Sequence, residues 1–532
     1  MSHAVATVAA CHLEQLFHGV AIKTIDYGAA SKYFSAELYF TGKYFETVLF
    51  VVILGGWKVV HQYKSNGYNI VLDVNSGMIH VVDDLAYDII GIYENNNQGN
   101  IIEAMVEKYT RPEFMRLIDK DNKGDFTETV ESLVRQIMEV LVDIEQLKKE
   151  GSLFTKDVYE DYIKEFKSRT TVVKALCLHI AHDCNLACRY CFAEEGEYKG
   201  GRSLMSYEVG KKALDFLIAS SGNRRNLEVD FFGGEPLMNF EVVKELVRYG
   251  REQEKLHNKN FRFTLTTNGV LLTDDVMEFA NKEMSNVVLS IDGRKEVNDL
   301  MRPSRNGKGS YDLILPKFLK LAESRNQNNY YVRGTFTHNN LDFAEDVKHL
   351  AELGFKQISV EPVVALPEEA YAIREEDLPV LFEEYDKLAK YVLERAGEGK
   401  EFNFFHFMID LSGGPCVAKR LSGCGSGTEY LAVTPWGDLY PCHQFVGITE
   451  YLMGNVFDGI KKTEIREEFR CCNVYSKEKC RNCFAKFYCS GGCAANSFKF
   501  HGDINDAYDI GCELQKKRVE CAIMIKAAQQ IL

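Results

Sequence analysis

Three cysteines in the first half of the chain have a spacing that suits metal chemistry. Cys184, Cys188 and Cys191 form a CxxxCxxC run directly after an apolar segment, with Tyr190 inside it. Thiolates spaced in this way can each bind one iron of a [4Fe–4S] cube. Three ligands leave the fourth iron open, and a metal that must bind a substrate needs an open position. The alternatives are buried loop cysteines or part of a zinc knuckle, which the tight spacing disfavours.

A second group of cysteines lies in the C-terminal part of the chain. Of the 16 cysteines, eleven fall between positions 416 and 521. Such a group forms disulfides in exported proteins and binds metal in cytosolic ones. The first twenty residues lack the basic region of a secretory signal, so we expect a cytoplasmic protein whose cysteines remain thiolates. A structural zinc domain is the alternative, because Cys-x2-Cys pairs also bind zinc.

Glycines and polar residues follow the apolar runs downstream of the first cysteines. Gly233 and Gly234 allow a ligand to approach the backbone, and the carboxylate of Glu235 can accept from an ammonium group. Each such residue alone is more often part of a turn or of the surface, but in series they predict one ligand site. The further candidates are Asn268, Ser290, Asp292 and Arg333.

Alternating strands and helices must position these residues. Apolar β-like runs recur with helical stretches between them, at 172–180, 227–232, 262–266, 286–291, 330–336 and 357–360. This alternation implies an α/β fold with a parallel sheet and right-handed crossovers. Because the candidate residues follow the strands, we expect a partial (β/α)6 TIM barrel over residues 165–370, with its site at the carboxyl ends of the strands. A helical bridge (371–415) and a Cys-rich domain (416–532) would follow.

The N-terminal part contains a smaller module. Residues 68–77 and 78–83 alternate apolar and polar side chains around Asn-Ser-Gly, which predicts a hairpin. Helical periodicity follows over three segments, which are 85–93, 101–109 and 127–150. A winged-helix-like domain over residues 58–151 fits this order, and its acidic helices favour a peptide or protein partner. Residues 1–57 remain an unassigned extension.

Composition limits the partners. Hydrophobic residues make up 46% and charged residues 26%, as in a protein with buried cores. The formal net charge of −14 argues against a nucleic-acid partner, since binding phosphates needs a basic face. The apolar run at 47–56 is about half of the ~20 residues that a membrane span needs. We therefore expect no membrane span.

The first cysteine motif, with an aromatic residue before its last cysteine, resembles the signature of the radical S-adenosylmethionine (SAM) superfamily. The resemblance implies that the open iron chelates the amino and carboxylate groups of SAM. One electron from the cluster would then release methionine and a 5′-deoxyadenosyl radical. It also implies that Glu235 holds the SAM amino group and that Ser290 and Asp292 face the ribose. Arg333 would pair with the SAM carboxylate.

The C-terminal cysteines resemble the seven-cysteine pattern of the SPASM domain, which holds two auxiliary [4Fe–4S] clusters. The resemblance implies three clusters in the whole chain, with interleaved auxiliary ligands. The ligands of the first auxiliary cluster would be Cys424, Cys442 and Cys493, and those of the second Cys480, Cys483, Cys489 and Cys512. Either Cys416 or a substrate thiolate would complete the first. The remaining free thiols would be Cys11, Cys177, Cys471, Cys472 and Cys521.

Three segments, 68–77, 188–196 and 429–437, resemble the maturases of SCIFF peptides, which are short precursors with six cysteines in forty-five residues. The resemblance runs from about residue 59 to the C-terminus. It implies that the N-terminal module captures the leader of a small Cys-rich precursor peptide and that a Cys-to-Thr type thioether is formed, with flavodoxin or ferredoxin as electron donor. The alternatives are a formylglycine-forming oxidase of the sulfatase-maturing type and a non-catalytic iron–sulfur or zinc protein.

Overall fold

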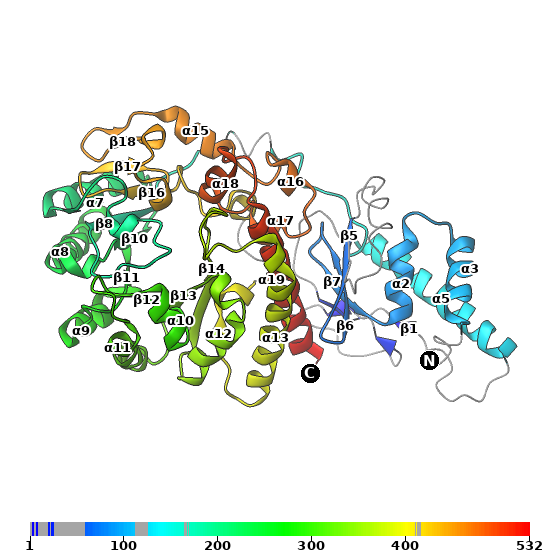
Figure 1. Cartoon of the computed structure of the whole chain (residues 1–532). Coiled ribbons are helices and arrows are strands. Elements are labelled where there is room, and N and C mark those ends of the chain that lie inside the picture. The colour runs from blue at the N-terminus through cyan, green and yellow to red at the C-terminus, as the bar shows by residue number, and fades with distance from the viewer. Residues whose placement is uncertain are drawn as a thin grey trace.

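The computed structural model describes residues 59–111, 126–163, 168, 170–409, 411 and 417–531, together with four short strands between residues 3 and 25. Cys11, Cys416 and the apolar run at 47–56 lie outside the described residues. Figure 1 shows the N-terminal module, in blue, beside a larger α/β body, with the red helix α19 (Asp509–Ile531) between them.

The centre of the body is a sheet whose main strands are parallel. In the described residues the six predicted runs are all strands, and they follow one another across the sheet in chain order. They are β8 (Ala175–His182), β10 (Asn226–Gly233), β11 (Asn260–Thr267), β12 (Met284–Ser290), β13 (Tyr330–Phe336) and β14 (Gln357–Pro362). Every residue of β8 is buried, as expected for a parallel strand that is covered on both faces.

Helices join successive strands, because parallel strands need long crossover connections. They are α7 (Tyr207–Ser220), α8 (Phe240–His257), α9 (Asp274–Glu283), α10 (Lys295–Met301), α11 (Tyr311–Ser324) and α12 (Phe343–Glu352). Helix α13 (Leu378–Gly397) follows β14 within the predicted bridge and packs on α19. Short 3-10 turns lie at Glu194–Gly196, Pro236–Asn239, His338–Asn340, Glu375–Asp377, Phe405–Phe407, His443–Phe445 and Thr449–Tyr451.

The Cys-rich part continues the same sheet. Strand β16 (Tyr430–Val433) pairs in parallel with β8, and β17 (Asp438–Tyr440), β18 (Gly454–Asn455) and β19 (Gly459–Ile460) extend it. At other positions β9 (Ser203–Leu204) pairs with β8 and β15 (Asn403–Phe404) pairs with β14. The short helices here are α14 (Val417–Ser422), α15 (Thr463–Cys471), α16 (Glu478–Arg481), α17 (Lys486–Cys489) and α18 (Ala494–His501). The sheet therefore crosses the sequence boundary predicted near residue 416.

The N-terminal module has the predicted hairpin and three helices. The hairpin is β6 (Tyr68–Asp73) with β7 (Ile79–Val82), and the helices are α2 (Asp84–Tyr93), α3 (Gln98–Tyr109) and α5 (Phe126–Glu150). Sequence reasoning missed β5 (Val60–Ser65), although Asn66 and Gly67, both at positive φ, are a strong hairpin signal. The short N-terminal strands are β1 (His3–Ala4), β2 (Thr7–Val8), β3 (Val20–Ala21) and β4 (Lys23–Ile25), and β4 pairs with β7.

The module is docked on the body through β5. The His61 imidazole stacks on Phe484 with 3.6 Å between ring centroids, and its Nε2 lies 2.8 Å from a carboxylate oxygen of Glu520 on α19. The Tyr63 hydroxyl donates to the Glu520 carbonyl at 2.9 Å. A search of the described helices found none with both the length and the apolar character needed to cross a membrane.

Candidate functional site

The first cysteine loop leaves β8 and packs directly on the backbone that follows β10. The Gly234 N–H donates to the Ala181 carbonyl at 2.7 Å, and the Glu235 N–H donates to the Asp183 carbonyl at 2.9 Å. A Cβ atom on Gly233 would lie 2.4 Å from the Ala181 oxygen, and one on Gly234 would lie 2.1 Å from the Asp183 oxygen. Both glycines are therefore needed because backbone meets backbone here. Gly233, Gly234 and Glu235 thus lie beside the loop that carries Cys184, as predicted.

Glu235 ties the ends of β10 and β11 together. Its side chain is fully buried and accepts from the Thr267 hydroxyl at 2.8 Å and from the Asn268 N–H at 2.8 Å. Burial raises the pKa of this carboxyl to about 7, although these hydrogen bonds oppose the rise. The Asn268 side-chain nitrogen lies 3.5 Å from the Cys184 sulfur. Three residues predicted separately therefore meet in one place.

Tyr190 links the cysteine loop to the end of β12. Its hydroxyl donates to the Asp292 carboxylate at 2.7 Å and accepts from Arg302 at 2.9 Å. Asp292 is fully buried and also accepts from the Thr335 N–H at 3.0 Å. Burial raises the pKa of Asp292 to about 6, with Arg302 opposing the rise. The protein itself thus engages the carboxylate for which the resemblance implied a ribose contact.

Arg302 is a residue that sequence reasoning missed. It follows α10, and the loop that carries Cys188 is hydrogen-bonded to this segment, with the Arg189 N–H donating to the Met301 carbonyl at 2.9 Å. The Arg302 side chain is 9% exposed, and its Nε is buried with no hydrogen-bond partner among the described atoms. The sequence feature that could have identified Arg302 is its position ten residues after Asp292, in the segment that follows the end of β12.

Ser290 and Arg333 are opposite each other in the register of β12 and β13. Arg333 is half-exposed, and its guanidinium lies 3.2 Å from a carboxylate oxygen of Glu361 on β14. The structure thus pairs Arg333 with a side chain across the sheet. Its predicted contact with SAM stays a prediction.

Imidazole and aromatic side chains lie between the first cysteine loop and Cys442. His179 and His182 on β8 have ring nitrogens 2.9 Å apart, and both rings pack on Tyr198. Phe192, next to Cys191, has its ring centroid 5.6 Å from that of His443. Since His443 follows Cys442, the ring contact connects the two cysteine groups.

Four cysteines of the second group line one cavity of about 320 Å³. They are Cys480, Cys483, Cys489 and Cys512, from α16, the turn after it, α17 and α19. Burial raises the pKa of Cys480 to about 11 and that of Cys512 to about 12, so these groups are thiols at neutral pH until a metal displaces their protons. The structure thus brings together all four cysteines predicted for the second auxiliary cluster.

The first auxiliary set is more open. Cys442 is buried, whereas Cys424 and Cys493 are exposed. Burial and, next in size, the negative charge of Cys493 raise the pKa of Cys442, and Cys424 adds to the effect. Cys472, predicted to be a free thiol, lines a cavity together with Cys424. No disulfide forms among the cysteines of the described ranges.

Within the described residues no three side chains of His, Cys, Asp or Glu are gathered closely enough to hold one metal ion.

A family model described as a 4Fe-4S single cluster domain matches residues 173–315. A cysteine-type anaerobic sulfatase-maturating enzyme of Clostridium novyi is 24% identical over 358 residues, which are 64% of this chain and 92% of that protein. The radical SAM cyclopropyl synthase TigE of Paramaledivibacter caminithermalis is 23% identical over 368 residues, which are 65% of this chain and 72% of TigE. The relatives of this chain thus include a radical SAM enzyme and a sulfatase-maturating enzyme.

The fold of this chain also has a solved counterpart. The structure of anSMEcpe with bound AdoMet and Cp18Cys peptide aligns with a TM-score of 0.57 at 21% identity, covering 68% of this chain and 99% of that one. The likeness shows a shared fold. Together, the family match and the relatives support binding of SAM and a [4Fe–4S] cluster and an enzyme that modifies peptides or proteins.

The side chains around the first cysteine loop suit a bound cluster and SAM. Three thiols line the loop, and a buried carboxylate, Glu235, lies within hydrogen-bond reach of Asn268, which in turn reaches Cys184. The buried N–H at Arg302 Nε has no acceptor among the described atoms, so it can donate a hydrogen bond to a bound group. Thiolates suit iron, and a carboxylate suits an ammonium group.

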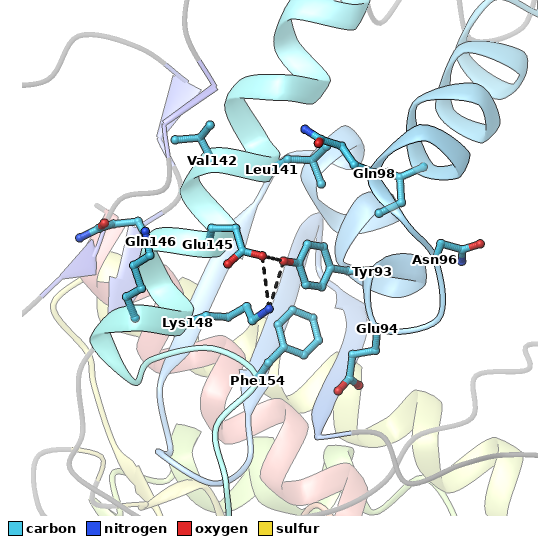
Figure 2. Close-up of a pocket in the computed structure, with 12 residues that line it drawn as sticks. Tyr93, Glu94, Asn96, Gln98, Leu141, Val142, Glu145, Gln146, Lys148 and Phe154 are labelled. Carbon is cyan, nitrogen blue, oxygen red and sulfur yellow. Dashed lines mark hydrogen bonds and ion pairs between the residues drawn. The ribbon is translucent and has the colours of Figure 1, made fainter.

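A separate pocket of about 730 Å³ lies in the N-terminal module. Figure 2 shows Glu145 and Lys148 of α5 reaching the Tyr93 hydroxyl, with the Phe154 ring beside it. The Tyr93 and Phe154 rings stack with their centroids 5.1 Å apart, and Val142 on the pocket wall is 65% exposed. The pocket thus offers an aromatic floor, an exposed apolar wall and both signs of charge.

Proposed function

We propose that the chain is a radical SAM peptide maturase that forms a Cys-to-Thr type thioether in a small Cys-rich precursor of the SCIFF type. The observation that carries the proposal is the single sheet that joins the two cysteine groups, in which β16 pairs with β8. This pairing, with the ring contact between Phe192 and His443, supports one reaction chamber bounded by both groups.

Cys184, Cys188 and Cys191 would hold the SAM cluster. Glu235 would accept from the SAM amino group, with Gly233 and Gly234 allowing the close approach. Ser290, Asp292, Asn268 and Arg333 are proposed to complete the cofactor contacts. When bound, the cluster and SAM supply a 5′-deoxyadenosyl radical. The protein orients the cofactor and excludes water, since the loop is covered by the ends of β10, β11 and β12.

Thioether formation removes two hydrogens from the peptide. One leaves the acceptor carbon as an atom, and the other leaves the cysteine as a proton together with one electron. The first auxiliary cluster, held by Cys424, Cys442 and Cys493, would be completed by Cys416 or by the substrate thiolate. The second, held by Cys480, Cys483, Cys489 and Cys512, would accept the surplus electron, and a flavodoxin or ferredoxin would donate the electron that SAM cleavage needs.

The N-terminal module would hold the leader of the precursor. Its support is the pocket of Figure 2, whose aromatic floor and exposed Val142 suit an apolar side chain of a peptide. Peptides are often captured by adding a strand to the edge of a sheet, but β7 is paired with β4 in the structure. Strand addition at β7 would thus require that β4 be displaced, so we place the leader contact at the pocket.

The test is a reaction of the anaerobically reconstituted enzyme with SAM, dithionite and a small Cys-rich peptide encoded beside its gene. We expect release of 5′-deoxyadenosine and a peptide lighter by two hydrogens and free of aldehyde. An aldehyde product would instead indicate the alternative function, a formylglycine-forming oxidase of the sulfatase-maturing type. Zinc in place of iron, with no 5′-deoxyadenosine released, would indicate a non-catalytic protein. Cys188→Ala is the control without SAM cleavage.

A further inference from the structure

Lys477 is a buried lysine with no carboxylate beside it. Its residue is 2% exposed, and its ammonium donates to the Asp506 carbonyl at 2.9 Å and to the Ser497 hydroxyl at 3.3 Å. Across the part of the chain that the structure describes, no ion pair includes Lys477. Its nearby counterpart Lys486 is also buried, but its ammonium lies 3.9 Å from the Asp157 carboxylate.

A buried ammonium without a counter-charge is unfavourable. Removing an ion from water costs several kcal/mol, and neutral hydrogen-bond acceptors recover only part of this. A native protein retains such a group where a negative charge lies nearby. Among the described residues no carboxylate forms an ion pair with Lys477, and a negatively charged group bound by the polypeptide would supply that charge.

The position of Lys477 indicates what that group is. Lys477 lines the cavity that contains Cys424, one proposed ligand of the first auxiliary cluster. Its carbonyl accepts from the Cys480 N–H at 3.1 Å, at the start of the helix that carries a proposed ligand of the second cluster. Gly491 lines both cavities, and a Cβ atom on it would lie 3.8 Å from the Lys477 side chain.

We propose that Lys477 is a shared counter-charge that sets the reduction potentials of both auxiliary clusters. The inference rests on the proposed two clusters. A cube bound by thiolates is negatively charged and gains a further negative charge on reduction. A fixed positive charge between two such cubes stabilises both reduced forms, so each accepts an electron more readily. Lys477 is a positioning residue in this sense, since it acts on the clusters through its charge and not on the substrate.

The test is a potentiometric titration of the cluster-loaded enzyme, followed by electron paramagnetic resonance. Lys477→Gln keeps a donor for the Asp506 carbonyl and removes the charge, whereas Lys477→Arg keeps the charge. We expect Lys477→Gln to lower the midpoint potentials of both auxiliary clusters and to leave the SAM cluster unchanged. A tenfold change in the reduced-to-oxidised ratio corresponds to about 59 mV for one electron. Lys477→Arg should remain close to wild type.

Lys516→Gln is the matched control. Lys516 lines the second cavity, but its side chain is 35% exposed and pairs with Glu513 at 2.6 Å. Solvent screens its charge, so its loss should shift the second auxiliary cluster by less and leave the first unmoved. A Lys477→Gln shift confined to one cluster, or no shift at full iron content, would overturn the proposal.

A second variant guards against loss of clusters in Lys477→Gln. Ser497→Asp adds a carboxylate within reach of the Lys477 ammonium and should lower both potentials without removing the lysine. Loss of iron by both variants would show a purely structural lysine and would also overturn the proposal. If wild-type enzyme carries only the SAM cluster, the proposed function itself fails, which is a distinguishable result.

Discussion

A single methyl group at Gly234 should remove the SAM cluster and leave the others in place. In Gly234→Ala the new Cβ would lie 2.1 Å from the Asp183 oxygen and 2.6 Å from the Asp183 carbonyl carbon. Neither atom is the end of a flexible side chain, so the cysteine loop must separate from β10. That separation breaks the hydrogen bonds from Gly234 to Ala181 and from Glu235 to Asp183.

The cost can be assembled from these contacts. Each backbone hydrogen bond contributes about 1 kcal/mol net, and overpacking adds about 1–3 kcal/mol. The sum of roughly 3–5 kcal/mol is below the ~5–15 kcal/mol that hold a typical protein folded, so we expect a folded protein with a displaced loop. A penalty of about 3 kcal/mol corresponds to a loss of roughly 100-fold in the rate of SAM cleavage.

The assay combines iron and sulfide counts, the resonance change of the reduced cluster on adding SAM, and release of 5′-deoxyadenosine. We expect Gly234→Ala to lose the SAM-responsive signal and retain the auxiliary signals. Gly397→Ala is the control, because a Cβ atom on Gly397 would meet no atom within 4 Å. Wild-type 5′-deoxyadenosine release by Gly234→Ala would refute the reasoning that the glycine sets the position of the loop.

The remaining predictions concern other parts of the protein. Tyr190→Phe removes the hydroxyl that binds buried Asp292 and Arg302. The free energy of unfolding should fall by about 1–3 kcal/mol, measured as a lower midpoint temperature in anaerobic thermal unfolding. Glu235 has its pKa raised from 4.5 to about 7, so the stability it confers is present below pH about 4.5 and is lost as pH rises through 7. Affinity for SAM, which needs the carboxylate, should rise over that window, and Glu235→Gln should abolish the dependence in binding titrations. Cys489→Ala should retain some SAM cleavage and lose crosslinking; equal loss of both in soluble, cluster-bearing protein would contradict separate roles. Val142→Glu should weaken precursor binding about tenfold or more, whereas Leu256→Glu, at an exposed apolar residue outside the pocket, should not.

Features that depend on local sequence were predictable. All six parallel strands were found. Strand β8 is buried along its whole length and reads as an apolar run, whereas β10 and β11 alternate buried and exposed residues. The four cysteines that were grouped from their spacing, which resembles a known pattern, line one cavity in the structure. The missed strand β5 has an Asn-Gly turn that did signal it.

Features that depend on distant contacts were not predictable. Tyr190 and Arg302 are 112 residues apart, and neither local segment contains a pattern that predicts their hydrogen bond. The isolation of Lys477 from carboxylates is likewise invisible in a sequence in which acidic residues are frequent. The continuous sheet from β8 to β16 is the largest such feature, because an accurate reading of cysteine spacing still suggested a boundary near residue 416.

The pairing of β8 with β16 also has a consequence for how the protein is made. The ribosome completes β8 at His182, but the strand that covers its outer side begins only at Tyr430. While residues 183–429 are being made, the emerging chain carries the first cysteine loop on a strand with one unpaired edge. Such long-range closure is slow and leaves the nascent edge open to aggregation or to early oxidation of its thiols. A heterologous host should therefore yield more iron-loaded protein when translation is slowed and oxygen is excluded during expression, rather than only after lysis.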